Sequence, residues 1–243
     1  MTGLSSSPRT AAERQLPTGG PPSYTVAVIP VYNESSTIAG LVRYVADAGV
    51  SEVVVVDDHS QDGSGALALS MGATVIRMPL NIGAWGATQA GLIYASRRNA
   101  DCVVTLDGDG QHKPDDIRAL VDPIVTARAN YVIGCFHQRG TGLERLGRII
   151  LRIISGLTVE DLTSGFRAYD PRAVKILLGP STYHFDYQDV GVLLLLEAKG
   201  LKKEEVKIVM LDRTDGKSRI FGTWPRIFHY IVSTILLVIS KRN

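Results

Sequence analysis

The stretch from Thr25 to Asp57 decides the fold, and it reads TVAVIPVYNESSTIAGLVRYVADAGVSEVVVVD. Its β-branched run over Thr25 to Pro30 predicts a strand, the spacing of apolar residues over Ser36 to Ala48 predicts a helix, and Glu52 to Asp57 predicts a second strand. A strand, a helix and a strand in this order form a βαβ unit, in which the two strands run parallel.

The same alternation continues along the chain. It predicts helices over Gly63 to Met71, over Ala84 to Ser96 and after Pro114, and strands over Thr74 to Arg77, Cys102 to Leu106 and Tyr131 to Cys135. Several of the strand runs are apolar on both faces, as a sheet covered by helices on both sides requires. The predicted fold class is α/β, with a mostly parallel Rossmann-like sheet, and ligands are expected beyond the carboxyl ends of its strands.

The composition excludes several classes of protein. The chain has 243 residues, enough for one domain with an appendage, and a net charge of +2 gives no basic field for nucleic acid. Hydrophobic residues at 45% and charged residues at 21% are typical of globular proteins rather than of disordered or coiled-coil chains. Cys102 and Cys135 lie in predicted strands, so we expect two reduced core thiols and neither a disulfide framework nor a cysteine zinc site.

The two ends of the chain differ from the middle. Residues 1–23 are rich in Ser, Pro, Gly and Thr and are expected to be a disordered tail before a folded domain over 24–220. Residues 221–243 contain the uncharged run Ile227 to Ser240, whose 14 residues would span about 21 Å as a helix, too short to cross a bilayer alone. A thin polar stripe favours an amphipathic, interfacial helix on a membrane surface; the alternative is a helix packed on the sheet or against a second subunit, in a possible homo-oligomer.

Polar clusters follow three of the predicted strands. They begin at Pro30, Asp57 and Asp107, and they are expected to converge on one edge of the sheet. No G-x-G-x-x-G follows the first strand and no G-x-x-x-x-G-K-[ST] occurs, so a dinucleotide oxidoreductase and a P-loop NTPase lose their main support.

The acidic segment after the strand at Cys102 to Leu106 carries the clearest chemistry. In an extended stretch Asp107, Asp109 and Gln111 point to one side, and Gly108 and Gly110 leave the other side open. Carboxylate and amide oxygens suit Mg²⁺ or Mn²⁺ shared with a substrate diphosphate. The alternative is an acidic turn that merely caps the next helix.

Six motifs, in this order and spacing, resemble the family 2 glycosyltransferases of GT-A fold, and within them the polyprenyl-phosphate or dolichyl-phosphate sugar transferases. They are IPVYNES, VVVDDHSQDG, NIGAWGATQAG, TLDGDGQHKPDDI, DLTSGFRAYDPRA and RTDGKS, and the similarity covers about Thr25 to Ile220. The resemblance implies a glycosyltransferase that moves a sugar from a UDP- or GDP-sugar to a polyprenyl phosphate with Mg²⁺ or Mn²⁺, associated peripherally with the cytoplasmic face of a membrane.

The resemblance also implies roles for the donor side of the site. The expected nucleotide-binding residues are Pro30, Tyr32, Glu34, Asp57, Asp58, Asn81, Gly83 and Asp107, and the expected metal ligands are Asp107, Asp109 and Gln111. Asp58, followed by Ser60 and Asp62-Gly63, could instead form only a turn and a helix cap. Trp85 stands where a smaller or tyrosine-like residue is usual, and its indole could be simple core packing.

The acceptor side is implied by later motifs. The expected acceptor and phosphate contacts are Arg145, Arg148, Ser164, Arg167, Arg213, Lys217 and Ser218, with Asp161 and Gly165 in the same motif as Ser164. Arg167 could instead form a structural ion pair, and the charges of RTDGKS a solvated run. Two departures from the family pattern occur: Cys135 and Phe136 follow Gly134 where an arginine is common, and Asp189 stands where the family often has Glu.

The expected catalytic residues are Asp107, Asp109 and Asp189. A phosphate acceptor is largely ionised near neutrality, because its second pKa is about 6, and needs no strong base. A sugar hydroxyl acceptor, the alternative within the family, would need a base such as Asp189 or Asp161. A nucleotide-sugar-binding protein without turnover is the alternative from a different class.

Overall fold

The computed structural model describes residues 24–136, 157, 159–162, 164–182 and 190–210. The strands are β1 (Thr25–Val31), β2 (Glu52–Asp57), β3 (Thr74–Arg77), β4 (Cys102–Thr105), β5 (Tyr131–Cys135), β6 (Arg167–Tyr169) and β7 (Lys203–Lys207). The helices are α1 (Ile38–Asp47), α2 (Ser64–Ser70), α3 (Gly83–Arg97), α4 (Ile117–Val125), α6 (Pro171–Leu177) and α7 (Val190–Ala198), with 3₁₀ turns η1 (Pro114–Asp116) and η2 (Pro180–Thr182).

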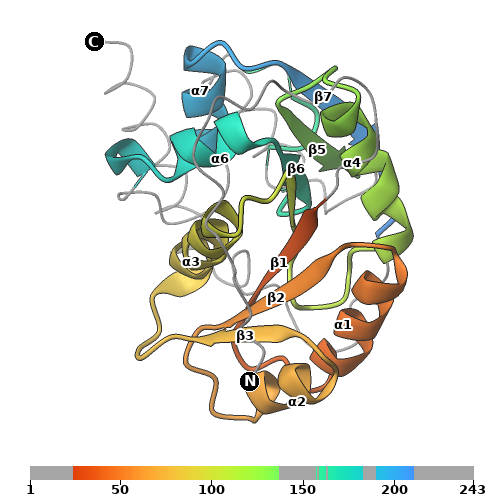
Figure 1. Cartoon of the computed structure of the whole chain (residues 1–243), viewed down its shortest axis with the longest axis vertical. Helices are drawn as coiled ribbons and strands as arrows, with labels where there is room; N and C mark the ends of the chain where they lie inside the picture. Colours follow the sequence, from red (N-terminus) through yellow and green to blue (C-terminus); the bar gives the residue numbers. More distant parts are fainter. Residues whose placement is uncertain (1–23, 137–156, 158, 163, 183–189, 211–243) are drawn as a thin grey trace, which may run out of the picture.

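The strands form one sheet in the order β3-β2-β1-β4-β6-β5-β7 (Figure 1). β2 and β3 extend the sheet on one side of β1, and the chain then returns to place β4 on the other side, parallel to β1. This change of direction makes β1 and β4 the topological switch point, where open α/β sheets bind their ligands beyond the strand ends. The predicted α/β class with a mostly parallel sheet is confirmed.

Helices cover both faces of the sheet because the strand side chains alternate between two apolar clusters. Val26 and Val28 of β1 enter the cluster under α3, α6 and α7, whereas Ala27 and Ile29 enter the cluster under α1, α2 and α4. The amphipathic α1 contributes one buried stripe, formed by Ile38, Leu41, Val42 and Val45.

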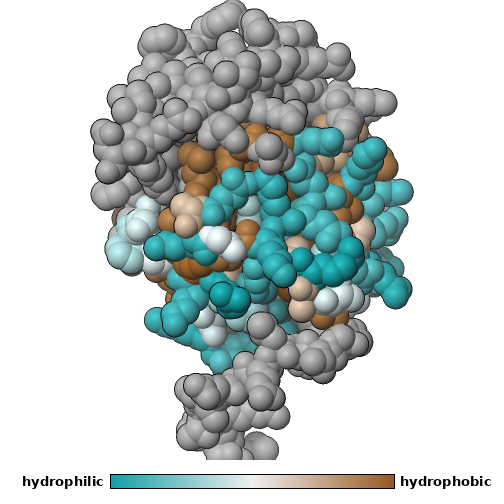
Figure 2. Space-filling view, turned by 90° about the horizontal axis from the view of Figure 1, so that it is seen from above, coloured by the Kyte–Doolittle hydropathy of each residue, from teal (hydrophilic) through white to brown (hydrophobic). Residues whose placement is uncertain are grey.

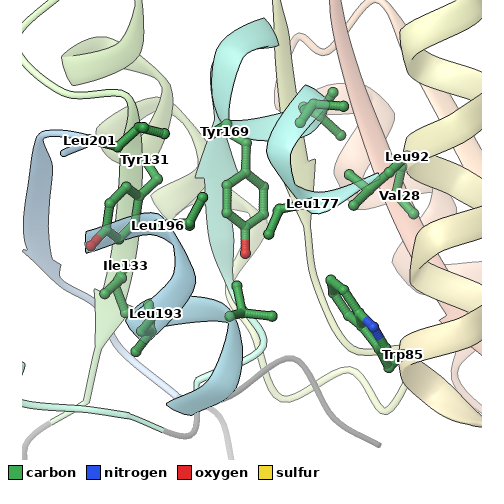
Figure 3. Close-up of a cluster of buried hydrophobic side chains, with 14 of the residues drawn as sticks. Val28, Trp85, Leu92, Tyr131, Ile133, Tyr169, Leu177, Leu193, Leu196 and Leu201 are labelled. Atoms are coloured by element: carbon green, nitrogen blue, oxygen red, sulfur yellow. The ribbon is translucent and has the colours of Figure 1, made fainter. Parts of the chain in front are cut away.

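The cluster under α3, α6 and α7 contains three of the largest buried side chains, Trp85, Tyr131 and Tyr169 (Figure 3). Trp85, at the start of α3, is 2% exposed, and its indole N–H donates to the carbonyl oxygen of Thr182 at 3.0 Å. Trp85 therefore packs in the core, the role that the sequence suggested for its indole. Tyr131 and Tyr169 lie opposite each other on β5 and β6 and are fully buried.

Beyond β4, only β5 was predicted, whereas β6 and β7 were not. β6 has only three residues and runs antiparallel to both β4 and β5, and β7 pairs with β5 as the last strand. Arg167 begins β6, directly opposite Thr105 of β4. Cys102 and Cys135 are buried and free, as predicted.

Candidate active site

The candidate site lies at the carboxyl ends of β1, β2 and β4, which are adjacent in the sheet. Each strand continues into a loop that carries a predicted polar cluster, beginning at Pro30, Asp57 and Asp107. The three clusters therefore converge on one edge, as the βαβ pattern predicted.

The loop after β4 is a turn, so the prediction of an extended stretch with alternating side chains was wrong. Gly108 and Asp109 form the turn, and Gly110 has a φ of +73°. A Cβ on Gly108 would lie 3.1 Å from the Pro30 carbonyl oxygen, so the loop packs tightly against the end of β1. The glycines are thus required for close approach and for a left-handed residue rather than to leave one side open.

The predicted metal ligands Asp107, Asp109 and Gln111 all lie on this turn and are partly exposed. The Asp109 carboxylate accepts a hydrogen bond from the backbone N–H of Gln111 at 3.1 Å, which closes the turn. Within the described part of the chain, no three His, Cys, Asp or Glu side chains gather as a metal site. Two carboxylates and one amide oxygen fit Mg²⁺ or Mn²⁺, which fill their remaining positions with water and substrate phosphate oxygens.

Hydrogen bonds join the loop after β1 to the loop after β2. The Asn33 amide nitrogen donates to Ser60 Oγ at 3.0 Å, and Asn33 Oδ1 accepts from the Gln61 amide nitrogen at 2.9 Å. Asn33 has a φ of +54°, in the left-handed region that asparagine tolerates better than most residues. These bonds fix the loop that follows β1 over the end of β2.

Two further bonds extend this junction between the loops. The amide nitrogens of Glu34 and Ser35 donate to Ser64 Oγ at 2.8 Å and to Asp62 Oδ2 at 2.9 Å. Burial alone would raise the pKa of Asp62, but hydrogen bonds from Ser64 and Ser35 outweigh it and lower that pKa to about 2. Ser64 and Asp62 therefore stabilise the junction between the two loops through the backbone.

Asp57 and Asp58 are each only 3% exposed, and both accept backbone hydrogen bonds. Asp57 Oδ1 accepts from the Ser60 amide nitrogen at 2.8 Å. The two oxygens of Asp58 accept from the amide nitrogens of Ile82 at 2.8 Å and Gly83 at 2.9 Å. Asp58 therefore caps the start of α3 rather than the local turn and helix that the sequence offered as its structural role. Its predicted contact with the base has to use the lone pairs that these two bonds leave over.

The other predicted nucleotide residues surround this junction. Tyr32 is 41% exposed, and Glu34 is partly buried on the same loop. Pro30 is partly buried near the end of β1. The side-chain Nδ2 of Asn81 donates to the backbone carbonyl oxygen of Asp58 at 3.3 Å. Gly83 has a φ of +83°, which allows the chain to enter α3 beside Asp58. The fold thus brings all the predicted nucleotide residues to one edge of the sheet.

The described part of the DLTSGFR segment lies beside the acidic loop, but the polar side chains of Asp161, Ser164 and Arg167 are buried. Ser164 is 1% exposed, Asp161 is 3% exposed, and Arg167 has no exposed surface. Arg167 Nη2 donates to the Leu162 carbonyl oxygen at 3.1 Å, and its Nε and Nη1 have no hydrogen-bond partner among the described residues. Contact between Arg167 and a lipid phosphate would therefore require this part of the structure to open, and within the described ranges Arg167 forms no ion pair.

Several predicted residues lie outside the described residues. They are Asp189, Arg145, Arg148, Arg213, Lys217 and Ser218. The predicted tail over 1–23 and the predicted helix over 221–243 also lie outside them. Their roles stay predictions.

His112 is a residue of this site that the sequence reasoning did not select. Its Nε2 lies 3.2 Å from Asp107 Oδ2, and the residue is 1% exposed. The signal was its place directly after Gln111, but a histidine in an acidic turn gives no indication from sequence of which way its ring points.

The described surface shows no broad apolar region on the face seen in Figure 2, where hydrophilic side chains predominate and smaller hydrophobic patches lie between them. Within the described ranges, no helix combines the length and the apolarity needed to cross a bilayer.

The comparison with protein families gives one match of direct relevance. The model of Glycosyl transferase family 2 matches residues 26–179. This range includes the loops after β1, β2 and β4 and the DLTSGFR segment.

Characterised relatives resemble the chain over most of its length. It is 31% identical to the polyprenol monophosphomannose synthase of Mycolicibacterium smegmatis, over 84% of this chain and 83% of the relative. It is 29% identical to the undecaprenyl-phosphate mannosyltransferase of Micrococcus luteus, over 81% of this chain and 87% of the relative.

Solved structures share the fold. Glucosyl-3-phosphoglycerate synthase from Mycobacterium tuberculosis, in complex with Mn²⁺, UDP-glucose and phosphoglyceric acid, superposes with a TM-score of 0.71 at 21% identity. The match covers 89% of this chain and 80% of that one.

Proposed function

The chain belongs to glycosyl transferase family 2 and is a glycosyltransferase, and from this premise we propose that it moves a sugar from a nucleoside diphosphate sugar to the phosphate of a polyprenyl lipid. The observation that carries the proposal is the similarity, over 81% and 84% of the chain, to relatives named for an undecaprenyl phosphate acceptor and a polyprenol monophosphomannose product. The acidic turn at the switch point of the sheet supplies the matching chemistry.

The donor side of the proposal uses the loops after β1, β2 and β4. The exposed Tyr32 and the partly buried Glu34 on the loop after β1 would contact the nucleotide, together with Pro30 near the end of β1. Asp58 would act mainly by fixing the start of α3 next to the base. UDP-sugars and GDP-sugars both suit these hydrogen-bonding groups.

The charge of the donor explains why acidic residues lie at this edge. Asp107, Asp109 and Gln111 would hold Mg²⁺ or Mn²⁺, which when bound supplies Lewis-acid stabilisation of the departing nucleoside diphosphate. Support comes from their shared turn and partial exposure, and from Mn²⁺ with UDP-glucose in the solved neighbour. Gly108 and Gly110 permit this turn, because Gly108 lies close to the end of β1 and Gly110 has a positive φ.

The acceptor side follows from the chemistry of a phosphate monoester. Its second pKa is about 6, so an oxygen is already ionised near neutral pH and attacks without a strong general base. The new bond joins this oxygen to the anomeric carbon while the bond to the diphosphate oxygen breaks, which inverts the anomeric centre. Arg145, Arg148 and Arg213 are proposed phosphate contacts, and Asp189 is kept as the proposed base for a hydroxyl acceptor.

A lipid acceptor places the reaction at a membrane. We propose that residues 24–220 form the catalytic domain and that 221–243 lie on the cytoplasmic membrane surface next to it. The run Ile227 to Ser240 supports this because it is apolar and uncharged.

The experiment is a transfer assay with purified protein, detergent-solubilised undecaprenyl phosphate, Mg²⁺ or Mn²⁺, and a panel of UDP- and GDP-sugars. We expect a glycosylated lipid in the mass spectrum that is lost with EDTA and in Asp109→Ala. Asp115→Ala is the matched control, because this side chain is 79% exposed on the same loop, outside the proposed ligand set. Transfer to free sugar hydroxyls alone, or donor binding with no product, would contradict the proposal.

A further inference from the structure

The Asp107 carboxylate has two close neighbours, His112 after the turn and Gly165 much later in the sequence. His112 Nε2 lies 3.2 Å from Asp107 Oδ2. A Cβ on Gly165 would lie 2.6 Å from Asp107 Oδ1 and 2.8 Å from Oδ2, so only a glycine leaves room for the carboxylate in this position. The Asp107 side chain is nevertheless 45% exposed and faces the site between these two neighbours.

His112 is itself held firmly. Its ring is 1% exposed and packs against Phe166, with ring centroids 5.0 Å apart and planes tilted by 39°. Its backbone forms an antiparallel bridge with Met210. A ring fixed in this way directs its Nε2–H at one point, where a mobile surface histidine would not.

The polar contacts of His112 show what the side chain is for. A carboxylate only accepts hydrogen bonds, so Nε2 carries the hydrogen that Asp107 receives. Nδ1 is buried and has no partner among the described residues. An unpaired buried nitrogen destabilises the fold, and an apolar side chain of similar size would avoid this cost. Stability therefore does not explain a histidine here, whereas its bond to Asp107 does.

One short segment supports both contacts. Gly165 lies against Asp107 and its neighbour Phe166 lies against the His112 ring. The Thr105 hydroxyl donates to the Gly165 carbonyl oxygen at 2.9 Å, which ties this segment to the end of β4. The SGF portion of DLTSGFR, implied by resemblance to belong to the acceptor side, thus shapes a donor-side acid.

We propose that His112 and Gly165 are positioning residues that fix the Asp107 carboxylate for the metal–nucleotide complex, an inference that rests on the proposed function. His112 acts through its Nε2 hydrogen bond, and Gly165 acts by leaving space. Without either of them, the half-exposed Asp107 side chain would populate other rotamers. Only the fraction of molecules with the binding-competent rotamer would then bind the metal and nucleotide, which lowers the apparent affinity.

The test measures binding of Mn²⁺ in the presence of UDP or GDP, from the electron paramagnetic resonance signal of the free ion, with no acceptor present. His112→Met keeps the size and removes the donor, and it should weaken Mn²⁺–nucleotide affinity by about 10- to 100-fold, as loss of a hydrogen bond to a metal ligand commonly does. His112→Gln places an amide N–H near the position of Nε2 and should restore binding.

Two further variants separate positioning from folding. Gly165→Ala should weaken binding like His112→Met, by displacing Asp107. Tyr94→Phe is the control, because the Tyr94 hydroxyl donates to Glu52 Oε1 at 2.7 Å at the start of β2, at the opposite edge of the sheet, and its loss should leave binding unchanged. Circular dichroism melting of each variant identifies any that do not fold.

The outcomes are distinct. Weakened binding in folded His112→Met with recovery in His112→Gln supports the inference, and the same loss in Gly165→Ala supports it if His112→Met does not fold. Wild-type affinity in both His112→Met and Gly165→Ala would overturn it while leaving the proposed function intact. A wild-type protein that binds Mn²⁺ with neither nucleotide would overturn both.

Discussion

Thr37 donates its side-chain hydroxyl to the carbonyl oxygen of Gly108, 2.9 Å away, and so ties the start of α1 to the acidic turn after β4. The two residues are 71 positions apart in the sequence. The turn that carries Asp107, Asp109 and Gln111 is therefore braced by the first βαβ unit and not by its own strand alone.

Replacing Thr37 by valine removes this bond with little change in volume. We expect a loss of about 1 kcal/mol in the free energy of unfolding, and weaker binding of Mn²⁺ with nucleotide because the turn loses a support. Urea unfolding and a binding titration check the two effects. Thr126→Val removes a similar hydroxyl bond, to the Asp122 carbonyl oxygen at 2.8 Å on the exposed end of α4, and should leave binding unaltered.

Asp58→Asn tests the capping of α3. The carboxylate accepts from two backbone amides, and an asparagine would turn an NH₂ group toward one of them. We expect a destabilisation of about 1–3 kcal/mol, the cost of leaving a buried donor unpaired. Chemical denaturation measures it against Asp47→Asn, an exposed aspartate at the end of α1. Equal stability of the two variants would contradict a capping role.

Asp62 predicts an acid-labile junction between the loops after β1 and β2. Its pKa in the folded protein is lowered to about 2, below the unfolded value of about 3.9. A lowered folded pKa stabilises the fold above the unfolded value, and this stabilisation is lost as pH falls from about 4 toward 2. The free energy of unfolding, measured with urea, should fall more steeply over this pH window for the wild type than for Asp62→Asn. Parallel pH curves for the two proteins would count against it.

Two helical glycines should respond in opposite directions to alanine. A Cβ on Gly91 of α3 would lie 2.2 Å from Val28 Cγ1 of β1, so Gly91→Ala overpacks the core and should cost about 1–3 kcal/mol. Gly40 of α1 has nothing within 4 Å of its Cβ position, so Gly40→Ala should add about 0.5–1 kcal/mol. The thermal unfolding midpoints of Gly91→Ala and Gly40→Ala, compared with the wild type, test this. A shift of both midpoints in the same direction would refute the packing explanation.

The first half of the fold was predictable because its signals are local. β2, β3 and β5 have the predicted bounds, and β1 and β4 differ from the prediction by one residue at one end. Long apolar or β-branched runs specify such strands by themselves. β6 was missed because it has three residues and carries a buried arginine, Arg167, which no local pattern marks as part of a sheet.

The site was predictable in composition and less so in detail. The motifs identified the residues at the strand ends, and the fold brings those it describes to one edge. The orientation of their side chains was not predictable. Asp58 is buried and accepts hydrogen bonds from the start of α3, Arg167 is buried, and His112 lies in hydrogen-bond contact with Asp107. These differences depend on partners supplied by other elements.

The sequence by itself determined the α/β class, the order of the first strands and the acidic, metal-compatible chemistry of the loop after β4, because apolar periodicity and residue type act over short stretches. Only the tertiary structure decided which carboxylates face the site and which accept backbone hydrogen bonds. Asp107 stays 45% exposed between His112 and Gly165. The two oxygens of Asp58 instead accept hydrogen bonds from Ile82 and Gly83, 24 and 25 positions away. A carboxylate takes the donors that surround it, and those donors are fixed by packing between elements distant in the chain.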